Sequence, residues 1–93
     1  MKIVQTPTFI RQTKKIHKNQ KADLDKAISA VVNDPNIGEF KKGDLSNIQV
    51  YKFKMVKQLT LLAYEFREHE LILVLLALGV HENFYRDLKN IVN

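Results

Sequence analysis

The order of apolar and polar residues along the chain predicts a strand, two helices, three further strands and a final helix. Ten consecutive apolar or glycine residues fill positions 71–80, and His81 comes directly after them. Extended, this run would reach about 33 Å, but coiled into a helix it would reach only about 15 Å, which is half of a bilayer core. Its content of Leu, Ile and Val favours a central strand covered on both faces. Such a strand would carry His81 and Tyr85 at its end.

The N-terminal segment predicts one short strand and one helix. Residues 2–5 are predicted to form the strand, because β-branched residues lie at its centre and Pro7 interrupts the extended pattern. Thr6 suits the N-cap of a helix that has Pro7 at its first position. Apolar residues on one face predict that this helix continues to about residue 18.

The clearest helical pattern in the chain comes next. Asn19 is the expected cap, and apolar residues then recur at the spacing of one helix face until Pro35 ends the helix. Residues 35–47 contain two glycines and are predicted to form a loop anchored by Phe40. The glycines match no phosphate-binding motif.

Strict alternation begins after this loop. In residues 51–55 the aromatic side chains and Met55 should face one side of a strand, while Lys52 and Lys54 face the other. The two lysines would stand about 7 Å apart, so their charges could converge on one phosphate or on neighbouring phosphates. The alternative is an edge strand that lysines protect against aggregation.

The remaining pattern completes an α+β domain over residues 1–93. Residues 56–58 are predicted as a hairpin turn, residues 59–67 as a strand with two apolar faces, and residues 82–92 as a short amphipathic helix. Two N-terminal helices can cover only one face of the resulting sheet. The second face would be partly covered by the terminal helix, occupied by a partner, or left as a basic surface.

Charge and composition narrow the choice of partners and compartment. Lysine and arginine number 15 against 10 acidic residues, a net charge of +5 that favours polyanions or an acidic protein. Arg11 and Lys14 lie on the basic face of the first helix, which is either solvated or a phosphate contact. Without cysteine the chain has no disulfides or thiolate metal sites, and the N-terminus lacks a signal-peptide run. We expect a cytoplasmic protein with no membrane contact, metal or cofactor.

Taken together, four segments resemble the RelE/ParE superfamily of bacterial type II toxins. These segments are TPTFIRQTKK, YKFK, LLAYEF and LALGVHENFY, and they occur in the family's order over essentially the whole chain. The resemblance implies two N-terminal helices packed on a small curved, mainly antiparallel four-stranded sheet, with a short C-terminal helix. It also implies neutralisation by a cognate antitoxin.

The resemblance assigns candidate catalytic residues. Lys52 and Lys54 match the paired lysines of RelE-type strands, His81 the basic residue after the last core strand, and Tyr85 the aromatic residue near the C-terminus. The alternatives are a cap or core-edge role for His81 and packing on the sheet for Tyr85. The chain departs from the family on the middle strand, which often carries a further basic residue. Leucines take that place, and the expected substitutes are Lys57, Arg67 or Arg86.

Two functions are implied by the resemblance, and the composition leaves a third. The first is a ribosome-dependent mRNA endoribonuclease that uses the 2′-hydroxyl as nucleophile and needs no metal, with RNA contacts at Arg11, Lys14, Lys57, Arg67 and Arg86. The second is a ParE-like toxin that inhibits DNA gyrase without acid–base chemistry. The third is a basic binding module with no toxicity. The sequence does not decide the codon preference or the oligomeric state.

Overall fold

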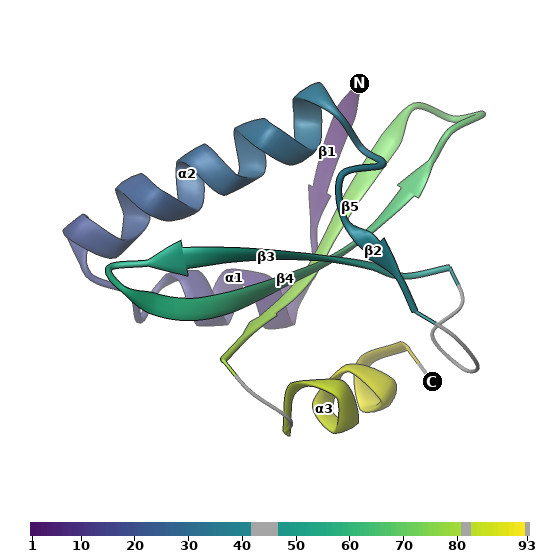
Figure 1. The fold of residues 1–93 in the computed structure, drawn as a ribbon. Coiled ribbons are helices and arrows are strands. Elements are labelled where there is room, and N and C mark those ends of the chain that lie inside the picture. The colour runs from purple at the N-terminus through teal and green to yellow at the C-terminus, as the bar shows by residue number, and fades with distance from the viewer. Residues whose placement is uncertain (42–46, 81–82, 93) are drawn as a thin grey trace.

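The computed structural model describes residues 1–41, 47–80 and 83–92, which form three helices and a five-stranded sheet (Figure 1). In chain order the elements are β1 (Lys2–Gln5), α1 (Pro7–Thr13), α2 (Lys18–Asn33), β2 (Glu39–Phe40), β3 (Gln49–Met55), β4 (Gln58–Arg67), β5 (Ile72–Gly79) and α3 (Asn83–Val92). The strand order is β1-β5-β4-β3-β2; β1 runs parallel to β5 and the other neighbours are antiparallel. The predicted α+β fold is confirmed, but the sheet has five strands instead of the four expected, because the short strand β2 adds to its edge.

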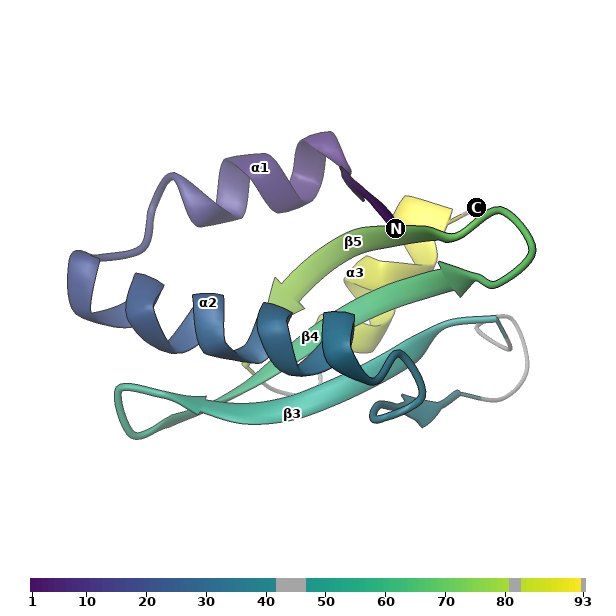
Figure 2. The same ribbon diagram turned by 90° about the horizontal axis from the view of Figure 1, so that it is seen from above.

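Helices pack on both faces of the sheet (Figure 2). On one face, residues of α1 and α2 join the sheet in a core that includes Phe9, Leu24 and Tyr64. On the other face, α3 places Phe84 and Leu88 in a second core. None of the described helices is long and apolar enough to cross a membrane.

The first helix begins as predicted but ends earlier. The Thr6 hydroxyl accepts a hydrogen bond from the Phe9 amide, 3.1 Å long, and donates to the Leu76 carbonyl of β5. The helix stops at Thr13 instead of near residue 18, because tight three-residue hydrogen bonds close the chain beyond it. The expected Asn19 cap is also wrong, since His17 precedes α2 in extended conformation and its amide donates to the Gln20 side chain, 2.7 Å away.

Strand β2 was not expected, because residues 35–47 predicted only a loop. Glu39 and Phe40 pair with β3, and the buried Tyr64 holds the preceding segment in place. The Tyr64 hydroxyl donates to the Pro35 carbonyl, 2.6 Å away, and accepts from the Gly38 amide, 2.9 Å away. Phe40 is 57% exposed, so Tyr64 anchors this segment and Phe40 does not.

Replacing Tyr64 with phenylalanine is expected to lower the free energy of unfolding by about 1–3 kcal/mol, because the buried Gly38 amide would lose its partner. Burial, with a smaller effect of Asp34, raises the pKa of the Tyr64 phenol above its ordinary value of 10.0. The unfolded chain therefore ionises first, and as pH rises past about 10 stability should fall more in the wild type than in Tyr64→Phe. Denaturant unfolding at pH 7 and pH 10.5 checks both statements. Equal loss of stability in wild type and variant at pH 10.5 would contradict the second.

A β-bulge in β5 decides which side chains reach α3. Ala63 pairs with Ala77 but Tyr64 pairs with Leu75, so Leu76 is an extra residue on β5. Leu76 and Ala77 consequently both belong to the α3 core, and the alternation reverses after them. Gly79 then faces α3, where a Cβ atom would collide with the Phe84 ring.

Beyond the end of β1, a side chain of α1 forms hydrogen bonds with the edge of β5. The Gln12 side chain forms two hydrogen bonds with the Leu78 backbone, each 2.7 Å long: its Nε2 donates to the carbonyl, and its Oε1 accepts from the amide. The amide group thus replaces a neighbouring strand at the point where the bulge has turned the chain. This arrangement fixes the direction in which β5 leaves the sheet.

The predicted hairpin turn joins β3 and β4, and it is strained. Val56 and Lys57 both have positive φ, 50° and 70°, as a two-residue type I′ turn requires. A β-branched residue is disfavoured there, whereas asparagine is tolerated. Val56→Asn should therefore raise the free energy of unfolding by about 1 kcal/mol, measured by denaturant titration. The Val56 amide, which donates to Asp23 of α2 over 2.8 Å, is kept in this variant; unchanged or lower stability would contradict the expectation.

Candidate functional site

Lys52 and Lys54 lie on the face of β3 that also faces α3, as the alternation predicted. Both residues are exposed, while Tyr51 and Phe53 turn to the opposite face and pack with the helices. Within the described part of the chain, no ion pair engages either lysine. The two ammonium groups are therefore available to an anion that approaches this face.

Two leucines of β4 stand directly beside the lysines. Lys52 pairs in register with Leu61, and Lys54 pairs with Leu59. Leu61 is 5% exposed and belongs to the α3 core, but Leu59 is 49% exposed. We call Lys52, Lys54, Leu59 and Leu61 the lysine–leucine patch. It combines two cations with one uncovered apolar side chain.

Tyr85 is half-buried on α3, and its ring lies between the α3 core and Lys41. Its ring packs against the α3 core and meets the Phe84 ring edge-on, with the centroids 5.5 Å apart. The Lys41 ammonium lies 5.1 Å above the centroid of the Tyr85 ring, within the range of a cation–π interaction. Lys41 also forms a 3.7 Å ion pair with Glu39. No local pattern pointed to Lys41, because the two residues that meet are far apart in the chain.

The remaining catalytic prediction, His81, lies outside the described residues. Strand β5 ends at Gly79, the exposed Val80 comes next, and α3 begins at Asn83. The role assigned to His81 stays a prediction.

The predicted RNA contacts are spread over the molecule. Lys57 lies in the turn after Lys54, and Arg86 is exposed on α3. Arg67 lies at the other end of β4, about 26 Å from Leu59 along the strand. Its Nε donates to Glu65 over 3.0 Å, and this hydrogen bond together with the carboxylate charge raises the pKa of Arg67 above its usual value. Lys57 is thus the substitute basic residue that lies nearest to the lysine pair in the chain.

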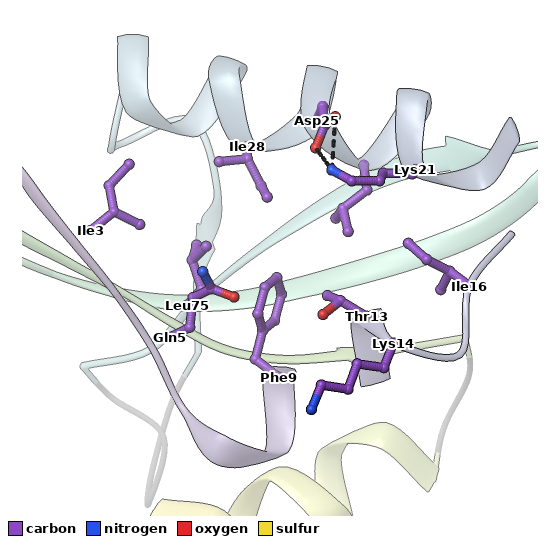
Figure 3. A pocket seen from close by; sticks show the side chains of 11 residues that line it. Ile3, Gln5, Phe9, Thr13, Lys14, Ile16, Lys21, Asp25, Ile28 and Leu75 are labelled. Carbon is purple, nitrogen blue, oxygen red and sulfur yellow. Dashed lines mark hydrogen bonds and ion pairs between the residues drawn. The ribbon is translucent and has the colours of Figure 1, made fainter. Parts of the chain in front are cut away.

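Arg11 lies on α1 and Lys14 directly after it, on the opposite side of the sheet. Arg11 donates to the Thr8 hydroxyl over 3.2 Å. Lys14 borders a cavity of about 460 Å³ between α1, α2 and β1 (Figure 3). The sequence did not predict this cavity. Phe9 and Leu75 lie at its floor and the Lys21–Asp25 ion pair at its rim. No group of three or more potential metal ligands occurs in the residues that the structure describes.

Comparisons with known proteins agree with this fold. The E. coli RelBE toxin–antitoxin complex contains a chain with a TM-score of 0.69 at 17% identity, covering 87% of this chain and 96% of that one. The isolated E. coli RelE toxin gives 0.67 at 17% identity, with 97% of each chain covered. A YoeB/ParE toxin from Agrobacterium tumefaciens gives 0.69 at 16% identity, covering 88% and 100%. At these identities the likeness shows a shared fold.

A family model identifies the chain more directly. No curated protein matches the sequence. The model described as the ParE-like toxin of type II bacterial toxin–antitoxin systems matches residues 3–89, which is nearly the whole chain. Since this match agrees with the RelE and YoeB/ParE folds, the resemblance found in the sequence is confirmed. The protein belongs to the ParE-like toxins of type II bacterial toxin–antitoxin systems, within the RelE/ParE superfamily.

Proposed function

We propose that this toxin is a ribosome-dependent mRNA endoribonuclease that inhibits translation in the cytoplasm. The observation that carries the proposal is the pair Lys52 and Lys54, exposed on one face of β3 and unpaired within the described residues. Two cations about 7 Å apart on one strand can reach one phosphate or two neighbouring phosphates. They are suited to stabilising the negative charge that develops on the phosphate when a phosphodiester is cleaved.

The chemistry assigns a role to each candidate. The 2′-hydroxyl attacks the adjacent phosphorus, a phosphorane forms, and the 5′-oxygen leaves with a proton. Lys52 and Lys54 stabilise the charge on the phosphorane oxygens. His81 can take the proton from the 2′-hydroxyl or return one to the 5′-oxygen, since histidine titrates near neutral pH. The resemblance to RelE-type toxins assigns the hydroxyl of Tyr85 to the same reaction. The reaction needs no metal or other cofactor.

An antitoxin is the expected protein partner. The E. coli RelE fold occurs in a complex with its antitoxin RelB. The net charge of +5 favours an acidic segment, and a partly disordered antitoxin could fold on this surface as it binds. Co-expression with such a partner should restore growth.

The proposal is tested by inducible expression of the wild type beside Lys52→Ala, Lys54→Ala and His81→Ala. The wild type should arrest growth and cut mRNA at positions that map to translating ribosomes. Each variant should cut less while remaining folded by circular dichroism. Folded wild-type protein that leaves ribosome-bound mRNA intact would rule out the proposal.

Inhibition of DNA gyrase is the second candidate, and the match to the ParE-like family model favours it. In this case the protein would act by binding alone. A supercoiling assay with purified gyrase separates the two functions. Loss of supercoiling without mRNA cleavage supports this second candidate, and the opposite result supports the endoribonuclease.

A further inference from the structure

Single-stranded RNA offers a protein two kinds of surface, the charged phosphates and the apolar faces of unpaired bases. Proteins that bind it therefore combine cations with apolar or aromatic side chains. The lysine pair supplies the cations on β3. An apolar side chain on the same face would supply the contact with a base.

Tyr85 is poorly placed for this contact. The Lys41 ammonium covers its ring at 5.1 Å, Phe84 meets it edge-on, and the ring packs against the α3 core. A base could stack on Tyr85 only after one of these neighbours moved. The aromatic residues of β3 are excluded as well, because Tyr51 and Phe53 pack on the opposite face.

Leu59 is a large apolar side chain that remains uncovered directly beside the lysines. Its register partner is Lys54, and cross-strand partners have Cβ atoms about 4.5–5.5 Å apart. It is 49% exposed, whereas its same-face neighbour Leu61 is 5% exposed under α3. The apolar surface therefore lies at the open end of the patch, next to the β3–β4 turn.

We propose that Leu59 contacts an unpaired base of the RNA and thereby positions the neighbouring phosphate on Lys52 and Lys54. This inference rests on the proposed endoribonuclease function. Leucine makes no directional hydrogen bond, so the contact selects bases by surface area and favours purines over pyrimidines. Lys57 lies in the turn directly after β3, and we expect it to contact the next phosphate of the RNA.

The test uses single-turnover cleavage of mRNA on programmed ribosomes at increasing toxin concentration. A base stacked on an aromatic side chain contributes about 5- to 150-fold in affinity, and the smaller leucine surface should contribute about 5- to 10-fold. Leu59→Ser should raise the half-saturating concentration by this factor and leave the maximal rate within about twofold. Leu59→Phe should lower the half-saturating concentration about threefold and increase the share of cuts beside purines.

Leu71→Ser is the matched control. Leu71 is 57% exposed in the turn between β4 and β5, at the other end of these strands, so its loss should leave cleavage unchanged. An unchanged half-saturating concentration in both Leu59 variants would overturn the inference. So would a Leu59→Ser variant that weakens antitoxin binding alone, since this surface would then belong to a protein interface.

A second measurement separates this inference from the proposed function. Binding of a labelled single-stranded oligoribonucleotide is followed by fluorescence anisotropy for the same variants. If the wild type cuts no mRNA, the proposed function fails, and a loss of oligonucleotide binding in Leu59→Ser still supports the base contact. Equal binding by wild type and Leu59→Ser overturns it.

Discussion

Replacing Lys54 with methionine is expected to slow mRNA cleavage about 100-fold at saturating toxin, and Lys52→Met should have an effect of similar size. Methionine keeps an unbranched apolar stem and removes only the charge. Both ammonium groups are solvent-exposed and unpaired in the described structure, so the stem has no buried partner to lose. The maximal rate should fall because the charge to be stabilised develops in the transition state.

A double variant that lacks both lysines shows whether they contact the same phosphate. If Lys52 and Lys54 contact the same phosphate, the loss in the double variant should be smaller than the product of the single losses. If they contact neighbouring phosphates, the losses should multiply. Their spacing of about 7 Å permits either arrangement, and comparison of the double variant with the two single variants decides between them.

Lys26→Met is the control for this prediction. Lys26 is exposed on α2, so the variant makes the same change in net charge away from β3. It should cleave at the wild-type rate, because a general electrostatic attraction alone is screened at physiological salt. Equal losses in Lys26→Met and Lys54→Met would mean that the protein attracts RNA by net charge and that β3 is no active site.

The position of the lysine pair was predictable because strand alternation is a local property. Lys52 and Lys54 alternate with Tyr51 and Phe53, and a strand can only place the two sets on opposite faces. Which of these faces meets α1 and α2 is decided by the same alternation, since the apolar set must be covered. The local sequence was sufficient at this point.

The end of β5 shows where local patterns fail. Residues 72–78 are all apolar, so nothing in the sequence marks Leu76 as the extra residue of a bulge. The bulge reverses the faces of the residues after it and brings Gly79 against Phe84. The direction of the chain toward α3 is therefore a property of the pairing between β4 and β5.

Two other features depend on residues far apart in the chain. Strand β2 forms because Tyr64, 26 positions beyond Gly38, binds the segment that precedes it. Similarly, Lys41, directly after β2, covers the ring of Tyr85 on α3, far along the chain. A single sequence offers no signal for such pairs, and the second changes how Tyr85 can act.

Replacing Tyr85 with phenylalanine is expected to lower the maximal rate of cleavage about 100-fold and to leave stability unchanged. The variant keeps the ring, and with it the contacts with Lys41 and Phe84. Only the hydroxyl is removed, so the variant tests this group apart from the ring. In the proposed mechanism this hydroxyl donates a hydrogen bond or a proton at the reacting phosphate.

A comparison with Tyr85→Leu separates the hydroxyl from the ring. If the hydroxyl acts, both variants should lose the same activity, because both lack it. If the ring stacks on a base, Tyr85→Phe should cleave like the wild type while Tyr85→Leu loses affinity for RNA. Single-turnover rates with thermal unfolding of each variant distinguish these cases from a role in packing, in which only Tyr85→Leu would unfold at lower temperature. Since the Lys41 ammonium already occupies a face of the ring, we expect the first result.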